Sequence, residues 1–151
     1  MKCDGCTMCC KLLNIEWMDS PAGKNCRECD PGKGCKIYDH APKKCLEFYC
    51  AYNQMADVSI NLRPDKCRVI FERVTDDIFI GTVDPNVERL NDDVRGQIQA
   101  FLNEGFSVVL FNQKIKEPFI QAAKGRTISE VWDVVKEEIK KVDARTSNLH
   151  N

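Results

Sequence analysis

The feature that most constrains this chain is the placement of its ten cysteines. Nine lie in the first fifty residues, and Cys67 follows soon after. The nine are Cys3, Cys6, Cys9, Cys10, Cys26, Cys29, Cys35, Cys45 and Cys50. No cysteine occurs after residue 67, so the distribution indicates that these side chains serve one local structure.

The amino-terminal residues bear on whether the cysteines form disulfides or bind metal. The chain opens Met1-Lys2-Cys3-Asp4, without the apolar run of a secretory signal. No stretch approaches the roughly 20 apolar residues of a membrane span. We therefore expect a cytoplasmic protein, in which dense cysteine is typical of metal binding or redox chemistry. A disulfide-stapled secreted domain is the alternative, and it would require a signal peptide removed before residue 1.

The cysteine spacing predicts a metal centre. The three groups are Cys3-x2-Cys6-x2-Cys9-Cys10, Cys26-x2-Cys29-x5-Cys35 and Cys45-x4-Cys50. A Cys-x2-Cys pair places two sulfurs within reach of one tetrahedral ion, about 2.3 Å from it. Several such pairs in one short segment predict closed thiolate sites, with all nine cysteines as candidate ligands.

The adjacent pair Cys9-Cys10 suggests more than one metal position. In an extended backbone the two side chains point to opposite sides, so they would serve different ions unless one sulfur bridges. We therefore expect at least two metals. Nine thiolates suit a three-zinc cluster with bridging sulfurs, and eight suit two separate four-cysteine sites.

The ligand type does not separate zinc from iron–sulfur, because both accept four thiolates in tetrahedral geometry. The first group begins like a bacterial ferredoxin run but lacks the following x3-Cys-Pro. The sequence also lacks Cys-x3-Cys-x2-Cys. These absences favour two or three zinc ions, with an iron–sulfur cluster as the alternative.

Other residues near the cysteines are assigned supporting roles. His40 is expected to lie in a turn rather than to ligate metal, and Cys67 to behave as a small buried hydrophobe outside the cluster. An apolar shell that excludes water from the metals is expected from Ile37, Tyr38, Phe48, Tyr49 and Tyr52.

The same segment resembles the YkgJ-type cysteine-cluster family of zinc- or iron-chelating domains. The resemblance lies in Cys3-Asp4-Gly5-Cys6-Thr7-Met8-Cys9-Cys10, Pro21-Ala22-Gly23, Gly34-Cys35-Lys36-Ile37-Tyr38 and Pro42-Lys43-Lys44-Cys45-Leu46-Glu47-Phe48-Tyr49-Cys50. Ala41 and Leu46 stand where the family tends to carry arginines. The cluster is also distantly similar to that of the flagellin lysine methylases, but this chain is shorter and has no glycine-rich loop for S-adenosylmethionine.

Residues 68–144 have the pattern of a small α/β scaffold. Two β-rich runs, 68–74 and 78–83, predict a hairpin. Asp84-Pro85 predicts an N-cap and first turn of a helix that ends at Gly105. An apolar strand follows at 106–111, and Thr127-Ile128-Ser129-Glu130 is a capping box that begins a second helix. Its apolar face carries Ile128, Val131, Trp132, Val135, Ile139 and Val142.

Together these patterns predict an α+β protein. A loop-dominated metal-cluster segment, residues 1–67, packs on the scaffold (hairpin, helix, strand, helix) and shares one core with it, and residues 145–151 form a frayed tail. The net charge of -1 gives no sign of a nucleic-acid or anionic-membrane partner. We expect a metal-binding protein with a structural, metal-handling or partner-recognition role, and no catalytic residue is assigned. The alternative is an iron–sulfur enzyme in redox chemistry or protein modification.

Overall fold

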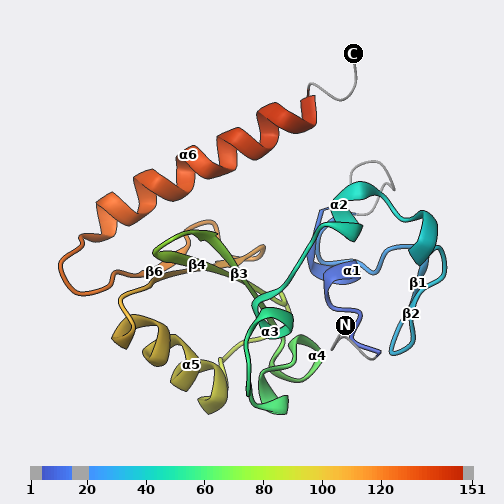
Figure 1. Ribbon diagram of the computed structural model, residues 1–151, viewed down its shortest axis with the longest axis horizontal. Coiled ribbons are helices and arrows are strands. Elements are labelled where there is room, and N and C mark those ends of the chain that lie inside the picture. The colour runs from blue at the N-terminus through green and yellow to red at the C-terminus, as the bar shows by residue number, and fades with distance from the viewer. Residues whose placement is uncertain (1–4, 15–20, 148–151) are drawn as a thin grey trace.

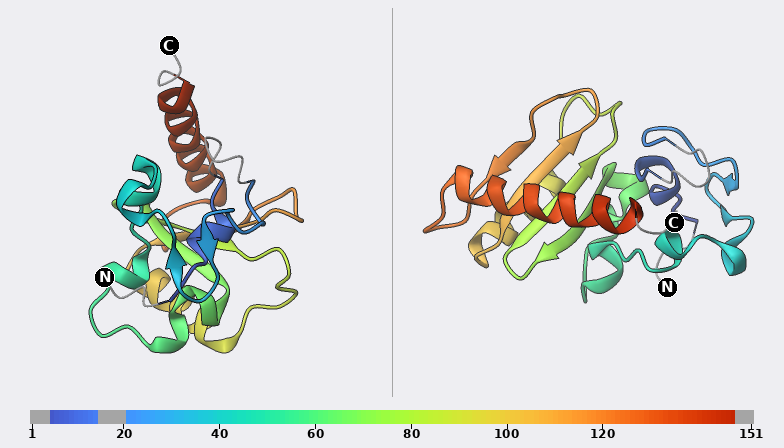
Figure 2. Two further views of the ribbon diagram at one scale, coloured as in Figure 1. Left: turned by 90° about the vertical axis from the view of Figure 1, so that its right-hand side faces the viewer. Right: turned by 90° about the horizontal axis from the view of Figure 1, so that it is seen from above.

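The computed structural model describes residues 5–14 and 21–147, and it has the predicted α+β class. A four-stranded sheet in the order β3-β4-β5-β6 forms the middle layer. Helix α6 lies on one face of the sheet and helix α5 on the other, with the cysteine-rich segment to one side (Figure 1). The view from above shows the same arrangement, with α6 crossing the sheet (Figure 2).

The sheet combines a hairpin with a parallel crossover. β3 (Val69–Thr75) and β4 (Ile78–Val83) are antiparallel, which confirms the predicted hairpin. β4 runs parallel to β5 (Ser107–Asn112), with Val83 opposite Asn112. The carboxyl ends of β4 and β5 therefore meet at one edge of the sheet. The short strand β6 (Phe119–Gln121), which was not predicted, adds antiparallel to β5.

Helix α5 (Asp92–Asn103) begins later than predicted, so the assignment of Asp84 as its N-cap is wrong. The N-cap is Asn91, whose side-chain oxygen accepts a hydrogen bond of 2.9 Å from the amide of Val94. Asp84 instead directly follows β4 and is fully buried. Two cationic side chains bind its carboxylate there, and this tertiary contact overrides the local Asp-Pro helix signal.

The predicted helix end at Gly105 is confirmed. Gly105 has φ 91°, and its amide donates to the carbonyl of Leu102 at 3.1 Å. The amide of Phe106 donates to the carbonyl of Phe101 at 2.9 Å. This pair of bonds is a Schellman motif, which requires the left-handed conformation that glycine adopts without strain.

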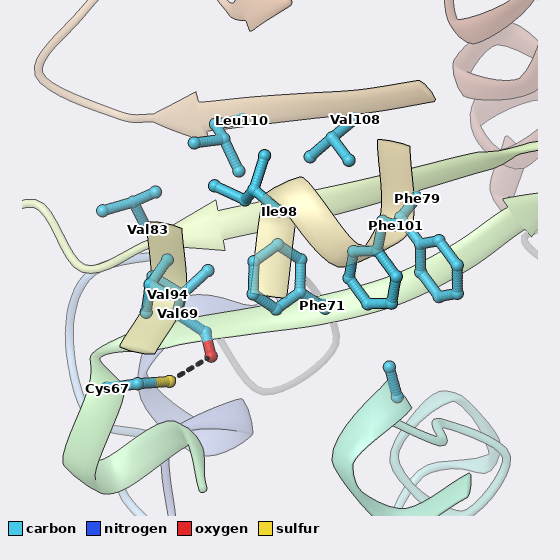
Figure 3. Close-up of a cluster of buried hydrophobic side chains, with 11 residues drawn as sticks. Cys67, Val69, Phe71, Phe79, Val83, Val94, Ile98, Phe101, Val108 and Leu110 are labelled. Atoms are coloured by element: carbon cyan, nitrogen blue, oxygen red, sulfur yellow. Dashed lines mark hydrogen bonds between the residues drawn. The ribbon is translucent and has the colours of Figure 1, made fainter. Parts of the chain in front are cut away.

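An aromatic cluster fills the space between α5 and the sheet (Figure 3). The ring of Phe79 stacks on Phe101 with centroids 4.1 Å apart, and Phe71 meets Phe101 edge-on at 5.6 Å. Gly81 lies under these side chains. A Cβ atom there would lie 2.5 Å from Leu110 Cδ2 and 2.9 Å from Phe71 Cε1, so the packing leaves no room for a side chain.

Cys67 belongs to the same core, as predicted. Its thiol is buried and donates to the carbonyl oxygen of Val69 at 3.3 Å (Figure 3).

Helix α6 (Ile128–Ser147) begins with the predicted capping box. The amide of Glu130 donates to Thr127 Oγ1 at 3.2 Å, and the Glu130 carboxylate accepts from the amide of Thr127 at 2.7 Å. The helix continues through Ser147, three residues into the segment predicted as a tail. Across residues 5–14 and 21–147, no helix combines the length and apolar character needed to cross a bilayer.

The sheet covers only part of the apolar face of α6. Val131 and Val135 are fully buried against Ile78, Ile80 and Val109. Ile139 and Val142, by contrast, are 39% and 51% exposed, and the second half of the helix extends beyond the sheet (Figure 1). Ile128 is also exposed.

The cysteine-rich segment consists of short elements joined by loops, as predicted. Within residues 5–14 and 21–67 none of them exceeds four residues: α1 (Cys9–Leu12), β1 (Cys29–Asp30), β2 (Gly34–Cys35), η2 (Tyr38–His40), α2 (Lys43–Leu46), α3 (Ala51–Gln54), η3 (Ile60–Leu62) and α4 (Pro64–Cys67). The segment joins the scaffold where Met8, Leu12 and Cys50 form a buried cluster with Ile70 of β3.

Replacing the capping residue should weaken α6. Thr127→Ala removes the hydroxyl that accepts from the amide of Glu130 and donates to its carboxylate, and should lower the free energy of unfolding by about 1 kcal/mol, measured by urea denaturation. Ser129→Ala, at an exposed site in the same turn, should change it by less than about 0.5 kcal/mol. Equal effects of the two substitutions would contradict a capping role.

Candidate metal centre

Seven cysteines line one cavity of about 430 Å³ in the cysteine-rich segment. They come from all three groups of the sequence: Cys6, Cys9, Cys10, Cys26, Cys35, Cys45 and Cys50. The fold thus brings thiols that are up to 44 positions apart in the sequence together around one cavity.

The two other predicted ligands have different positions. Cys3 lies outside the described residues. Cys29 is buried in β1 opposite Cys35 of β2, where it packs against Cys26 but does not line the cavity. All nine cysteines that the structure describes, Cys67 included, are free thiols.

The backbone at Cys9 and Cys10 is not extended, although the expectation of at least two metals assumed that it was. They form the first turn of α1, and both line the cavity. A hydrogen bond joins their side chains, and Cys10 makes a further one with Cys29. The expectation that the adjacent side chains point apart is therefore wrong, because the local backbone is helical. The number of metals stays a prediction.

The thiols differ in acidity because their surroundings differ. The hydrogen bond with Cys10 lowers the pKa of Cys9 to about 7, although burial acts in the opposite direction. The same bond and burial hold the pKa of Cys10 well above its ordinary value. Burial also raises the pKa of Cys6 to about 11. Hydrogen bonds from the backbone at Met8 and Asp65 lower this pKa, but burial outweighs them.

Cys45 illustrates how the thiols influence one another. Its pKa is raised by burial first, and then by the negative charge that Cys9, Cys26 and Cys35 would carry when ionised. Like charges in one cavity oppose each other, so the ionisation of one thiol disfavours the ionisation of its neighbours. A bound cation would remove this opposition, because metal ligation requires and stabilises thiolates.

Basic and acidic side chains nearly balance in the cysteine-rich segment. Residues 1–50 contain eight basic side chains, Lys2, Lys11, Lys24, Arg27, Lys33, Lys36, Lys43 and Lys44, against seven acidic ones, Asp4, Glu16, Asp19, Glu28, Asp30, Asp39 and Glu47. Lys33 lines the cavity, where its charge favours a nearby thiolate.

The donor chemistry of the cavity fits zinc or an iron–sulfur cluster, which both take thiolate ligands. No histidine, aspartate or glutamate is among the residues that line it. Among the residues that the structure describes, no three His, Cys, Asp or Glu side chains lie close enough to hold one ion. The cavity therefore offers the required atoms, but a shared ion would have to draw them closer together.

The predicted apolar shell is only partly correct. Ile37, Tyr38 and Phe48 line the cavity, together with Leu13, Pro42 and Ile70. Tyr49 is 53% exposed, and Tyr52 packs in the cluster around Met8 and Leu12 without lining the cavity. His40 is exposed in η2, away from the cavity wall.

A buried carboxylate ties this segment to the sheet. Asp84 is 0% exposed at the end of β4, and its Oδ2 accepts a bond of 2.6 Å from Lys11 Nζ of α1. Arg68, at the start of β3, binds the same oxygen, and the amide of Asn86 donates to Oδ1 at 3.0 Å. Burial raises the pKa of Asp84, but the bond from Lys11 and the other partners outweigh it and hold the pKa below its usual value.

Gln113, which follows β5, makes a second contact at the same edge. In the amide orientation that satisfies both of its groups, it donates to the carbonyl of Ala22 at 2.8 Å and accepts from the amide of Gly23 at 3.3 Å. The sequence did not predict the contacts of Lys11, Asp84 and Gln113. Only Asp84 carried a signal, and that signal indicated a helix cap.

Comparisons of the chain with known protein families, with curated proteins and with solved structures found no match. The resemblance to the YkgJ-type family therefore stays a prediction based on the cysteine spacing.

Removing the carboxylate of Asp84 should destabilise the fold in a pH-dependent way. Asp84→Asn should lower the free energy of unfolding by about 3 kcal/mol at neutral pH, because it leaves the two cations without their buried partner. The pKa of Asp84 is lower in the folded than in the unfolded chain. Its stabilisation is thus complete above the ordinary carboxyl pKa of about 3.9 and is lost as the pH falls through the folded value.

Urea denaturation between pH 7 and pH 2.5 would measure the free energy of unfolding of the wild type and of Asp84→Asn. The difference between the two should shrink only at the acidic end. Asp77→Asn is the matched control. Asp77 pairs with Arg126 but is half-exposed, so its loss should cost about 1 kcal/mol or less at neutral pH. A difference for Asp84→Asn that does not change with pH would contradict the assigned role of its charge.

Proposed function

We propose that this protein binds transition-metal ions, two or three zinc ions in the first place, through the cysteine thiolates of its amino-terminal segment. The observation that carries the proposal is the convergence of seven cysteines from three sequence groups on one cavity of about 430 Å³. Cys3 and Cys29 are further candidate ligands from the spacing of the sequence.

The surroundings of the thiols support a metal centre over a set of structural cysteines. Cys67 shows what a structural cysteine looks like in this chain: it packs in the aromatic core and bonds a neighbouring carbonyl. The seven cavity cysteines instead share one space, and Lys33 lines it with them. Such a space would suit several ions bridged by shared sulfurs better than one isolated ion.

The role we propose for the metal is first of all structural. The elements of residues 5–67 are too short to be stable by themselves. Structural zinc contributes on the order of 10–16 kcal/mol per ion to the folding of zinc-finger peptides. Metal handling or recognition of a partner could build on the same centre.

Metal analysis tests this proposal directly. The intact chain, purified without oxygen and without added metal, should contain two or three equivalents of zinc and be colourless. Iron with acid-labile sulfide, and absorption above roughly 400 nm, would favour the alternative of an iron–sulfur protein. Protein that contains neither metal, and takes up neither when both are supplied with reductant, would contradict the proposal.

Substitution of single cysteines should separate the cavity from the core. Cys35→Ala should weaken zinc binding by at least about tenfold, because loss of even an outer partner of a ligand has that effect. Cys67→Ala, the matched control, removes a thiol that does not line the cavity and should leave the zinc content unchanged. Competition with a chromophoric chelator measures both affinities, and equal affinities would exclude Cys35 as a ligand.

A further inference from the structure

The carboxyl edge of the parallel pair β4–β5 carries the polar contacts that hold the cysteine-rich segment. Because the two strands are parallel and end in register at Val83 and Asn112, the residues that follow them lie at one edge. Asp84 binds Lys11 there, and Gln113 binds the backbone of Ala22 and Gly23. Lys11 directly follows the cavity cysteine Cys10, and Gly23 lies three residues before the cavity cysteine Cys26.

Lys11 is the residue that connects this edge to the cavity. It follows Cys9 and Cys10 directly in α1, and its side chain is only 18% exposed. Its carbonyl accepts a hydrogen bond of 2.7 Å from the amide of Gly23, and the carbonyl of Cys10 accepts one of 2.8 Å from the amide of Cys26. Three cavity cysteines thus lie on backbone that is linked to Lys11 within one or two residues.

We propose that Lys11 is a positioning residue of the metal centre, an inference that rests on the proposed function. Through its ion pair with Asp84 it holds α1 against the sheet and fixes the thiols of Cys9 and Cys10 in the cavity. It touches neither metal nor any reacting atom. Lys11 lowers the conformational entropy that the cysteine ligands lose when a metal binds, because it holds them in place beforehand.

The physical reason is the length of α1. A helix of four residues has no stability of its own, so its orientation depends on outside contacts. The buried cluster around Leu12 holds one side of the turn, and the ion pair holds the side chain that follows Cys10. Freeing one of these contacts leaves the thiols with more conformations, and binding a metal must then order them.

Arg68 provides a matched comparison because it binds the same carboxylate from the sheet. Its side chain is 42% exposed and starts at β3, so it makes no link to α1. Lys11→Met and Arg68→Met each remove one cation from Asp84 and leave the other. General loss of stability should therefore be similar in the two variants, whereas loss of positioning should appear only in Lys11→Met.

The experiment compares zinc affinity, measured by competition with a chromophoric chelator under reducing conditions, in the wild type and the two variants. Cobalt(II) substituted for zinc reports the thiolate geometry through its charge-transfer absorption, and thermal unfolding of the metal-free proteins reports stability. We expect Lys11→Met to bind zinc about tenfold more weakly, with altered cobalt absorption. Arg68→Met should bind like the wild type at comparable metal-free stability.

Equal zinc affinity in Lys11→Met and the wild type would overturn the inference and leave the proposed function intact. An equal loss of zinc affinity in both variants would also overturn it, because the ion pairs of Asp84 with Lys11 and Arg68 would then act through stability alone. Failure of Lys11→Met to fold with zinc present would assign Lys11 to folding and overturn its positioning role. If the wild type itself binds no metal, the proposed function fails first.

Discussion

The cysteine-rich segment is built from elements too short to be stable alone, and the rest of the structure depends on this constraint. Within residues 5–14 and 21–67 its helices and strands have at most four residues, fewer than an isolated element needs to be stable in water. It therefore relies on the sheet, through the packing of Leu12 on Ile70 and the ion pair of Lys11 with Asp84. The geometry of the cavity is set by the scaffold as much as by the cysteines.

Local signals predicted the scaffold well where they act within one element. The capping box at Thr127 and the glycine stop at Gly105 both depend on neighbouring backbone groups, so the sequence contains all the partners. Asp84-Pro85 carried an equally clear local signal for the start of a helix, but the prediction was wrong. Its carboxylate is bound by Lys11, 73 positions away, and no local pattern reveals such a partner. The short strand β6 was missed because three residues carry too little periodicity.

The candidate site was predicted in composition but not in arrangement. Spacing identified the cysteines, and seven of the nine line one cavity. It could not show that Cys9 and Cys10 lie in a helical turn, because adjacent cysteines fit several backbone conformations. Nor could it show that Cys29 turns from the cavity into a buried contact with Cys26, which depends on the pairing of β1 with β2. The sequence identifies the candidate ligands, whereas their orientation depends on the tertiary structure.

The packing around Gly81 has a consequence for how mutational tolerance should be read in this protein. Any side chain at that position would collide with Leu110 and Phe71, neither of which lines the cysteine cavity. A site that accepts no substitution in this chain therefore need not belong to the proposed metal centre. Replacements that preserve shape but remove sulfur separate the proposed ligands from the residues needed for packing.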